Sequence, residues 1–597
     1  MTRWALGCWA LGVGVLAVDG PVALRALACL PAVLWAPGVG FASRLSTGGG
    51  RLQVALDAAW IAIGLAVVDV ALCRVLGLGS WGLLGLSGLW LAGGLALAGG
   101  RPVRGSTRPQ AWGGVAIAAF LLAGAAAAWS PALSRPLAAY WWLGGADQLP
   151  AEGPGWAEGT GWAEVSRPGW AEAGAGRLVD VDGDGGVLTL QSPGQLVIAV
   201  QGPVGTALSV GDASAVVSRD VQEQDDSEPV PRYLGHGVAA VLISAPAGEL
   251  AVDVAGPPGA VVYVFPSSEA IWAVHHEGDL RFTHKWQILN IVENQRWAAE
   301  LLKDRWITIN QPPLWSHVLA VAVALVDPGL AGANGLLLWV LVLLAASSVR
   351  LVEALAPGAS PLAWALPGAY AVVHLGLMVE PASTTFPDSL YAAAWVAGMI
   401  ALVDTRPWRV AGLGLAAGLL RYPGTIALTL AAGVQRATLG RTATRGLAAL
   451  WATVVAVAAV LALAALVSED LQHWLRVLWF ETVPEHYDNN REAPPIWQRP
   501  PIFYGHWLYY TGGGVALAAL GLGQRPVRFL LGSAGVYSLM LCTIDHFPTH
   551  YFLPLVALTG AAVAVSTARH RHKLLRHGVP VLALLGAAAW IGWGRIL

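Results

Sequence analysis

Two carboxylates separated by one glycine, Glu277 and Asp279, stand in a polar stretch that follows a series of short β-rich runs. A carboxylate within hydrogen-bond reach of a hydroxyl or an amine can act as a general base. Arg421 has a different setting, because it interrupts a long apolar run and is followed by Tyr422 and Pro423. An ionisable group within a membrane segment is a candidate functional residue. The simpler interpretations are a solvated loop for the acidic pair and, for Arg421, a guanidinium that extends to the membrane surface.

Metal binding is the second chemistry that these residues suggest. His275, His276 and His284 flank the acidic pair, but no two of them have the i, i+4 spacing that places two ligands on one helix face, so we expect no bound metal there. Residues 180–185 match the front half of a calcium loop, yet Gln191 occupies the position where a bidentate glutamate belongs. A tight Asp/Gly turn between strands is the preferred interpretation, and no cofactor is predicted.

The composition places these residues in a membrane protein. Hydrophobic residues make up 56% of the 597 residues and charged residues 12%, against about 25% charged residues in soluble proteins. The net charge is −2 and no basic cluster is long, which argues against a nucleic-acid partner. The four cysteines lie in or beside apolar runs without a Cys-x-x-Cys spacing, so neither a zinc site nor a disulfide framework is indicated.

Apolar segments near the length of a membrane-spanning helix cover most of the chain outside one large polar insertion. They run near residues 4–19, 22–42, 53–73, 80–99 and 111–130, then 314–327, 333–349, 361–379, 389–403, 410–434, 447–467, 511–523, 529–544, 551–567 and 578–595. The first is interpreted as an uncleaved helix, since further apolar segments follow it at once. Several segments are short or are broken by Gly and Pro, so we expect about 12 to 16 crossings.

Arginine and lysine residues collect in the short connections between these segments, and such connections are typically cytoplasmic. The basic connections lie near residues 44–51, 101–108, 406–409, 436–445, 525–528 and 569–576. This pattern predicts a cytoplasmic N-terminus, with residues 131–313 and 468–510 outside. It also requires 314–349 to count as one crossing despite its Asp327-Pro-Gly break. Residues 410–434 must enter and return, with a turn near Arg421.

The insertion has two parts of different composition. Residues 131–176 include three copies of Gly-Trp-Ala-Glu, at 155–158, 161–164 and 169–172. We interpret this part as a low-complexity linker, with a sugar-stacking or interfacial element as the alternative. Residues 177–266 contain short β-rich runs punctuated by Gly, Pro and Asp, which predict a small β-sandwich. The order of these runs resembles carbohydrate-binding-module or PA14-like jelly rolls.

Four further motifs occur in a fixed order after the sandwich. They are Gln311-Pro-Pro-Leu-Trp315, Phe386-Pro-Asp-Ser-Leu390, the glycine-rich run Gly412–Pro423 that ends in Arg-Tyr-Pro, and Thr549-His-Tyr-Phe-Leu-Pro554. As a set they resemble GT-C glycosyltransferases of the protein O-mannosyltransferase and aminoarabinose transferase type. The departures are a Glu-Gly-Asp sequence where that family has an Asp-Glu pair, and His550 where it has an arginine. The sequence leaves open which of the two carboxylates would act as the base.

The resemblance implies a polytopic α-helical membrane protein (GT-C-like) with an inserted extracytoplasmic β-sandwich domain. Residues 1–110 would be additional N-terminal helices, 111–130 the first core helix, 267–313 the external catalytic-type loop and 314–597 the rest of the core. It also implies a catalytic role for Asp279 or Glu277 and donor-phosphate binding by Arg421 and His550. The remaining predicted cavity residues are His276, Gln311, Asp388, Tyr422 and Tyr551.

The expected function is transfer of a sugar from a polyprenyl-phosphate carrier to an extracytoplasmic acceptor, which is a glycan, a lipid or a protein, at the inner (plasma) membrane. The external loop 468–510 mixes charged and aromatic residues, which suits either an acceptor-binding lip or a solvated loop. Two other classes of protein stay open at this point. One is a membrane transporter, and the other is a non-catalytic protein that binds or assembles envelope polysaccharide.

Overall fold

The computed structural model describes the helical residues 1–46, 50–99, 109–129, 313–326, 330–377, 387–421, 423–466, 499–511, 513–542, 549–570 and 572–594, a few isolated residues (298, 301–302, 468, 471–472 and 475), and the strands and turns named below. The chain separates into two compact units. The first comprises Met1–Ser130 and Trp297–Leu597, and the second comprises Pro131–Arg296. The described elements of the first unit are helices, and those of the second unit are β-strands.

Six helices of the first unit precede the insertion. They are α1 (Thr2–Ala17), α2 (Val22–Leu34), α3 (Gly38–Leu45), α4 (Arg51–Leu76), α5 (Ser80–Ala98) and α6 (Pro109–Trp129). Helices α4 and α5 both end at a glycine with positive φ, Gly77 and Gly99, which satisfies the last carbonyls of a helix without steric cost. Helices α2 and α3 are bent by 43° relative to each other, at a break that contains Pro37, because proline cannot continue a helix from its N-terminal side.

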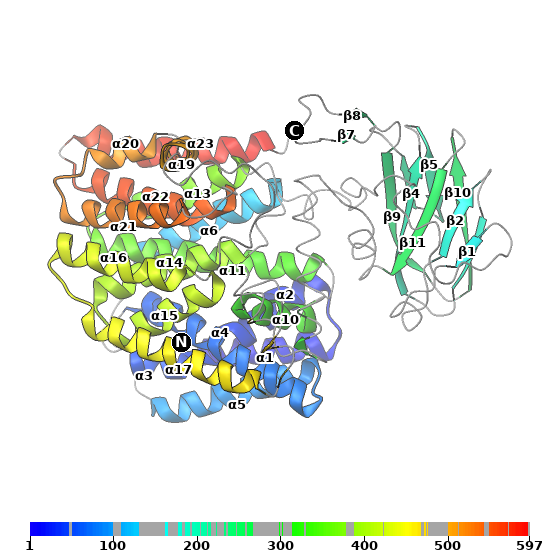
Figure 1. Ribbon diagram of the computed structural model, residues 1–597, viewed down its shortest axis with the longest axis horizontal. Helices are drawn as coiled ribbons and strands as arrows, with labels where there is room; N and C mark the ends of the chain where they lie inside the picture. The colour runs from blue at the N-terminus through cyan, green and yellow to red at the C-terminus, as the bar shows by residue number, and fades with distance from the viewer. Residues whose placement is uncertain are drawn as a thin grey trace. The chain divides into compact units, whose positions relative to one another are not determined.

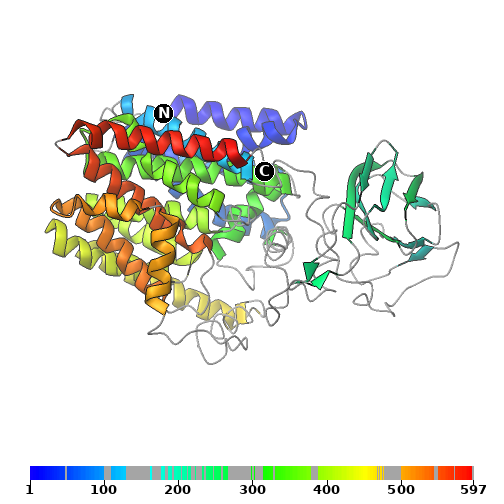
Figure 2. The ribbon, with the colours of Figure 1, turned by 90° about the horizontal axis from the view of Figure 1, so that it is seen from above.

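The remaining elements of this unit follow the insertion. They are α10 (Pro313–Leu325), α11 (Leu330–Leu355), α12 (Pro361–Trp364), α13 (Leu366–Leu377), α14 (Pro387–Asp404), α15 (Pro407–Leu420), α16 (Gly424–Leu439), α17 (Thr444–Ala465), α19 (Arg499–Tyr510), α20 (Gly514–Ala519), α21 (Arg525–Leu541), the 3-10 turn η6 (Thr549–Phe552), α22 (Leu553–Ala568), the π-helical turn η7 (Leu574–Gly578) and α23 (Val579–Gly594). Helix α19 is seen end-on in Figure 1 and lengthwise in Figure 2, so it runs across most of the other helices.

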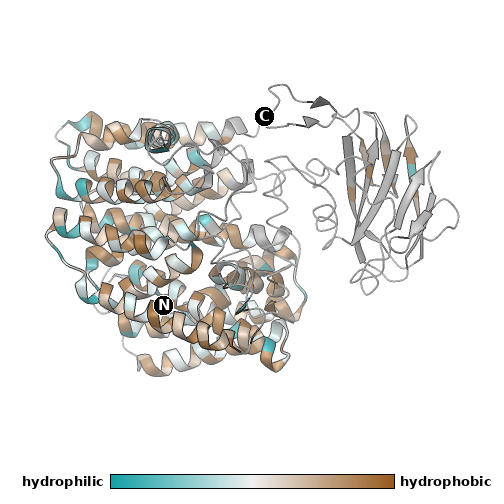
Figure 3. Cartoon of the chain, viewed as in Figure 1, coloured by the Kyte–Doolittle hydropathy of each residue, from teal (hydrophilic) through white to brown (hydrophobic). Residues whose placement is uncertain are grey.

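Helices α14 and α22 form the centre of this unit, because nearly every residue of each is buried. Trp364 and Trp395 are fully buried beside many alanines and leucines. Helices α17 and α23 are peripheral, with only 6% and 11% of their apolar windows buried. A helix that is apolar on its exposed faces is typical of a membrane protein, and Figure 3 shows hydrophobic residues along the outer helices as well as the inner ones.

Among the residues that the structure describes, five helices are long and apolar enough to cross a membrane, or six if the bent pair α2–α3 is one span. Four further apolar helices, among them α1, α10 and α22, are shorter. The expectation of a helical membrane protein is confirmed at this level, whereas the larger number of crossings stays a prediction. The apolar run 410–434 is divided into α15 and α16 at Arg421, where the sequence predicts a turn.

The second unit contains two main sheets. A five-stranded sheet has the order β1-β2-β11-β4-β9, and a four-stranded sheet has the order β3-β10-β5-β6. The strands are β1 (Trp162–Glu164), β2 (Arg177–Val181), β3 (Gly186–Leu190), β4 (Gly194–Gly202), β5 (Ala207–Val210), β6 (Ala213–Val216), β9 (Gly237–Ala245), β10 (Gly248–Ala255) and β11 (Ala260–Pro266), and the pair β7 (Gln222–Glu223) and β8 (Arg232–Tyr233) lies apart. All the pairings are antiparallel, and the packing of the two sheets as a sandwich stays a prediction.

One strand lies where the sequence predicts only a linker. The middle copy of the Gly-Trp-Ala-Glu repeat supplies β1, an edge strand that pairs Trp162 with Val179 and Glu164 with Arg177. The backbone therefore has hydrogen-bond partners in a segment whose composition alone indicates low complexity. The Asp/Gly turn proposed for the calcium-like motif, residues 182–185, lies outside the described residues.

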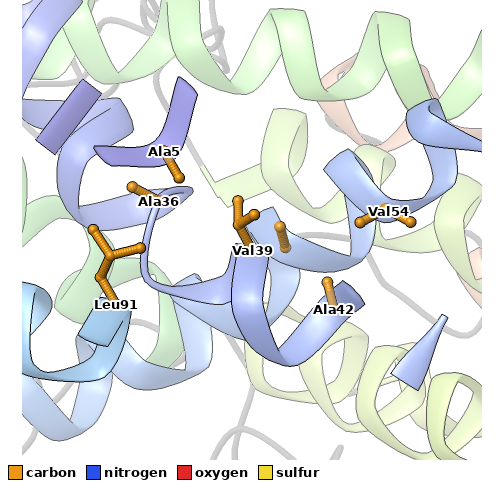
Figure 4. Packing of buried hydrophobic residues seen from close by; sticks show 7 residues of the cluster. Ala5, Ala36, Val39, Ala42, Val54 and Leu91 are labelled. Carbon is orange, nitrogen blue, oxygen red and sulfur yellow. The ribbon is translucent and has the colours of Figure 1, made fainter. Parts of the chain in front are cut away.

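Close packing of α3 against its neighbours generates a stability prediction. Figure 4 shows the small side chains Ala36, Val39 and Ala42 of this contact. A β-carbon added at Gly40 would overlap the backbone of Gly94 in α5, whereas one added at Gly64 of α4 would meet nothing within 4 Å.

We therefore expect Gly40→Ala to lower the free energy of unfolding by about 1–3 kcal/mol, because backbone atoms cannot move aside as a flexible side chain can. The matched variant Gly64→Ala should be neutral or slightly stabilising, since alanine favours a helix over glycine. Unfolding of the purified protein in mixed micelles measures both. Equal stability of the two variants would contradict the packing at Gly40.

Candidate functional site

Arg421 and Asp388 form a bidentate ion pair. The Nε of Arg421 donates to Oδ1 of Asp388 at 2.9 Å, and Nη2 donates to Oδ2 at 2.7 Å. The Asp388 side chain is 2% exposed and the Arg421 side chain 21% exposed. The carboxylate is thus enclosed by protein, while part of the guanidinium is open to its surroundings.

Local structure explains how two residues 33 positions apart meet. Asp388 lies in the first turn of α14, after Pro387, where a negative charge is favourable because of the helix dipole. Arg421 ends α15 with an extended backbone (φ −152°, ψ 120°). The next helix begins at Gly424, where a β-carbon would overlap the carbonyl oxygen of Ala417. The close return of the chain at this turn therefore depends on glycine.

Two tyrosines complete this group. Nη1 of Arg421 donates to the hydroxyl of Tyr551 at 3.3 Å, and the guanidinium carbon lies 4.7 Å from the Tyr551 ring centroid, within the range of a cation–π contact. The hydroxyl of Tyr537 in α21 donates to the carbonyl oxygen of Tyr551 at 3.3 Å. We call Asp388, Arg421, Tyr537 and Tyr551 the Arg421 cluster. It joins α14, the end of α15, α21 and η6.

The Arg421 cluster lies at the helix ends opposite the basic connections. Helix α14 begins and α15 ends at the cluster, α21 ends near it, and η6 leads into α22. The basic residues occur at the other ends of the same helices: Arg406 and Arg409 at the start of α15, Arg525 and Arg528 at the start of α21, and Arg569 after α22. If the basic connections are cytoplasmic, the cluster faces the outside.

Aromatic residues of α19 pack beside the cluster through η6. Phe503 stacks on Phe552 with ring centroids 4.5 Å apart, and Tyr510 lies 5.0 Å from Phe552 and 5.1 Å from His374 of α13. Trp507 donates through Nε1 to the hydroxyl of Thr559 at 3.0 Å. The end of the predicted external loop 468–510 is therefore a packed helix, which its mixture of charged and aromatic residues did not indicate.

Three of the predicted site residues, Arg421, Asp388 and Tyr551, are in contact in the structure. The other predicted residues Glu277, Asp279, His276, Gln311 and Tyr422 lie outside the described residues, as does the side chain of His550, whose backbone belongs to η6. Within the described part of the chain, no group of three or more His, Cys, Asp or Glu side chains could hold a metal ion. Tyr537 was not predicted, because an aromatic residue in an apolar run carries no signal of its own.

The geometry assigns different tasks to the two charged side chains. Both carboxylate oxygens of Asp388 accept hydrogen bonds from Arg421, so Asp388 orients the guanidinium and is poorly suited to remove a proton. The bonds to Asp388 and Tyr551 use three of the five N–H groups of the guanidinium. A partly exposed arginine held in this way can bind a phosphate or a carboxylate through its open edge.

No protein-family model, no curated protein and no solved structure matches the chain. The likeness to GT-C glycosyltransferases therefore rests on the order of the sequence motifs.

The Arg421–Asp388 pair gives a prediction for stability. We expect Asp388→Asn to lower the free energy of unfolding by about 1–3 kcal/mol, because it removes charge-assisted hydrogen bonds from a buried position. Asp19→Asn is the control, since the Asp19 side chain is 86% exposed in its ion pair with Arg25, and we expect a change below about 0.5 kcal/mol. Unfolding in mixed micelles compares the two. A loss for Asp388→Asn no larger than for Asp19→Asn would contradict the proposed energetic role of the pair.

Proposed function

We propose that the protein is a membrane glycosyltransferase that moves a sugar from a polyprenyl-phosphate carrier to an acceptor outside the cytoplasm. The observation that supports this most is the partly exposed guanidinium of Arg421, which Asp388 and Tyr551 orient. A cation fixed at the end of apolar helices suits a ligand whose phosphate lies at the membrane surface and whose hydrocarbon chain lies within it.

The proposed reaction assigns one step to each charged group. The acceptor oxygen or nitrogen attacks the anomeric carbon, and the bond between that carbon and the phosphate oxygen of the carrier breaks. The electron pair of this bond stays on the phosphate, whose charge Arg421 stabilises. His550 is the second residue assigned to phosphate binding by the motif series. The proton of the acceptor passes to Glu277 or Asp279, the carboxylates of the predicted external loop.

The surface of α19 suits the carrier's position at a membrane boundary. Tyr509 is 65% exposed and Leu508 is 51% exposed, while Phe503 and Trp507 on the same helix pack inward. Exposed tyrosines are enriched at membrane–water interfaces, since the ring is apolar and the hydroxyl can stay wet. Helix α19 crosses most of the other helices of its unit (Figures 1 and 2), which is the arrangement expected for a helix that lies along an interface.

The proposal includes a location for each part of the chain. The N-terminus lies in the cytoplasm of a cell whose inner (plasma) membrane holds the helices, and residues 131–313 lie outside. The two sheets of the second unit pack as a β-sandwich. Buried valines alternate along β10, at Val252 and Val254, as expected for a strand with one covered face.

The first test of this proposal uses donor binding, because it needs no knowledge of the acceptor. Tritiated undecaprenyl phosphate is titrated onto the purified protein in lipid nanodiscs. We expect Arg421→Gln to weaken its binding about tenfold or more, since a charge-assisted contact to phosphate is lost. Arg436→Gln is the matched control, because Arg436 is an exposed arginine in the last turn of α16, at the opposite end of the helices. Equal affinity in the Arg421 and Arg436 variants would contradict the assignment.

The second test is transfer itself. Labelled polyprenyl-phosphate sugars are incubated with the wild-type protein and an extract of its native envelope. We expect Arg421→Gln to lower the rate of transfer about 100- to 1000-fold, as for the loss of one group that stabilises the leaving oxyanion. Glu277→Gln and Asp279→Asn separately identify the base. Absence of transfer by folded wild-type protein from every such donor would reject the enzyme class.

The orientation of the protein in the membrane is tested separately, by labelling positions at the two ends of α17. In a variant without the native cysteines, we expect a cysteine at Ser468 to react with a membrane-impermeant maleimide in intact cells. A cysteine at Thr442 should react only after permeabilisation, because it lies among the arginines that precede α17. The reverse labelling pattern would show that the basic connections face outward.

A further inference from the structure

A second buried group of charges lies at the opposite end of α15. Arg409, in the first turn of that helix, donates from Nη2 and Nε to Oδ2 of Asp57 at 2.6 and 3.2 Å, and from Nη1 to Oδ2 of Asp404 at 2.8 Å. The side chains of Arg409 and Asp57 are each 4% exposed. Ser46 and Gln53 also donate to Asp57, the latter at 2.9 Å. The carboxylate of Asp57 thus accepts hydrogen bonds from three side chains, those of Arg409, Ser46 and Gln53.

This group joins helices that lie far apart in the sequence. Asp57 and Gln53 belong to α4, Arg409 to α15 and Asp404 to the end of α14. Arg350 of α11 connects them further, since its Nε donates to Oε1 of Gln53 at 3.0 Å and its Nη2 lies 3.8 Å from Oδ2 of Asp404. We call these five residues the Asp57 network. Through this network, α4, which precedes the insertion, supplies the Asp57 carboxylate that binds Arg409 at the start of α15.

The sequence of α15 makes such an anchor important. Its 14 residues span roughly 21 Å at the usual rise per residue, and its middle consists largely of Gly, Ala and Leu. Gly414 and Gly418 form close contacts with Leu450 of α17 and Thr425 of α16, where a β-carbon would overlap them. The middle of α15 has no charged side chain, so its charged contacts come from the two ends. We expect the ion pairs at its two ends to fix its axial position together with this packing.

We propose that Asp57 is a positioning residue, which fixes α15 through Arg409 and thereby holds the guanidinium of Arg421 where the donor phosphate binds. Binding of the donor phosphate by Arg421 rests on the proposed function, whereas the anchoring of α15 by Asp57 rests on the geometry of that helix. The helices before the insertion then have a definite role in the site, although none of the described contacts of Arg421 comes from them.

Asp57→Asn tests this role with a nearly isosteric change. Arg409 keeps its bond to Asp404, so the chain should fold. We expect faster hydrogen exchange of the amides near Ala417 and Arg421, at the far end of α15, because the helix is no longer held at its start. We also expect undecaprenyl phosphate to bind about three- to tenfold more weakly, the size of effect expected for coupling through packed elements. Asp57→Glu, which restores the carboxylate, should recover most of both losses.

Gly88→Ala is the control for a general loss of stability. A β-carbon added at Gly88 of α5 would overlap the Trp9 ring of α1, and neither residue takes part in the bonds to Asp57 described above. This variant should leave exchange near Arg421 and binding unchanged. Unchanged exchange near Arg421 in Asp57→Asn, or an equal change in Gly88→Ala, would overturn the positioning role. If the wild-type protein fails to bind undecaprenyl phosphate, the proposed function fails, and the exchange measurement still decides the role of Asp57.

Discussion

The cost of placing a charge among apolar helices is the constraint on which this structure depends. A buried arginine without a partner would be strongly destabilising, whereas a paired and hydrogen-bonded one is tolerated. Helix α15 has an arginine near its start and another just after its end, and each meets a carboxylate from a different helix, Asp57 and Asp388. The two pairs differ in one respect that bears on function. Arg409 is enclosed on all sides, and Arg421 is one-fifth exposed.

Much of the helical architecture was predictable, because the length of an apolar run and the position of its breaks depend on local sequence. The division of 410–434 at Arg421 is an example, since the Arg-Tyr-Pro sequence both adds a charge and stops the helix. The sequence also placed Arg421, Asp388 and Tyr551 in one set of motifs. It could not show their pairing, which needs residues 33 and 130 positions apart. Asp57 lies within the apolar segment 53–73, where an ionisable residue is itself a signal, but it belongs to no motif, and its partner Arg409 lies 352 positions away.

The inserted unit shows a similar division between local and long-range information. Short β-rich runs punctuated by Gly, Pro and Asp predicted strands within 177–266, and the strands β2 to β11 lie there. The order of these strands in two sheets could not be derived, since hydrogen bonding between strands depends on contacts distant in sequence. The edge strand β1 is the instructive difference. Its Trp-Ala-Glu segment has a partner in β2, although a repeated short unit is compositionally typical of a linker.

The ion pair also limits which groups can perform the chemistry. Both oxygens of the Asp388 carboxylate accept hydrogen bonds from the guanidinium of Arg421, so neither is directed at a bound acceptor. Asp388 is therefore the wrong residue to activate an acceptor, despite its place beside Arg421. The proposed glycosyl transfer would therefore need its base from elsewhere, and Glu277 and Asp279 are the acidic residues of the motif series that remain for this task. A protein that only bound an anion would need no such second carboxylate, so the effect of replacing the acidic pair separates catalysis from binding.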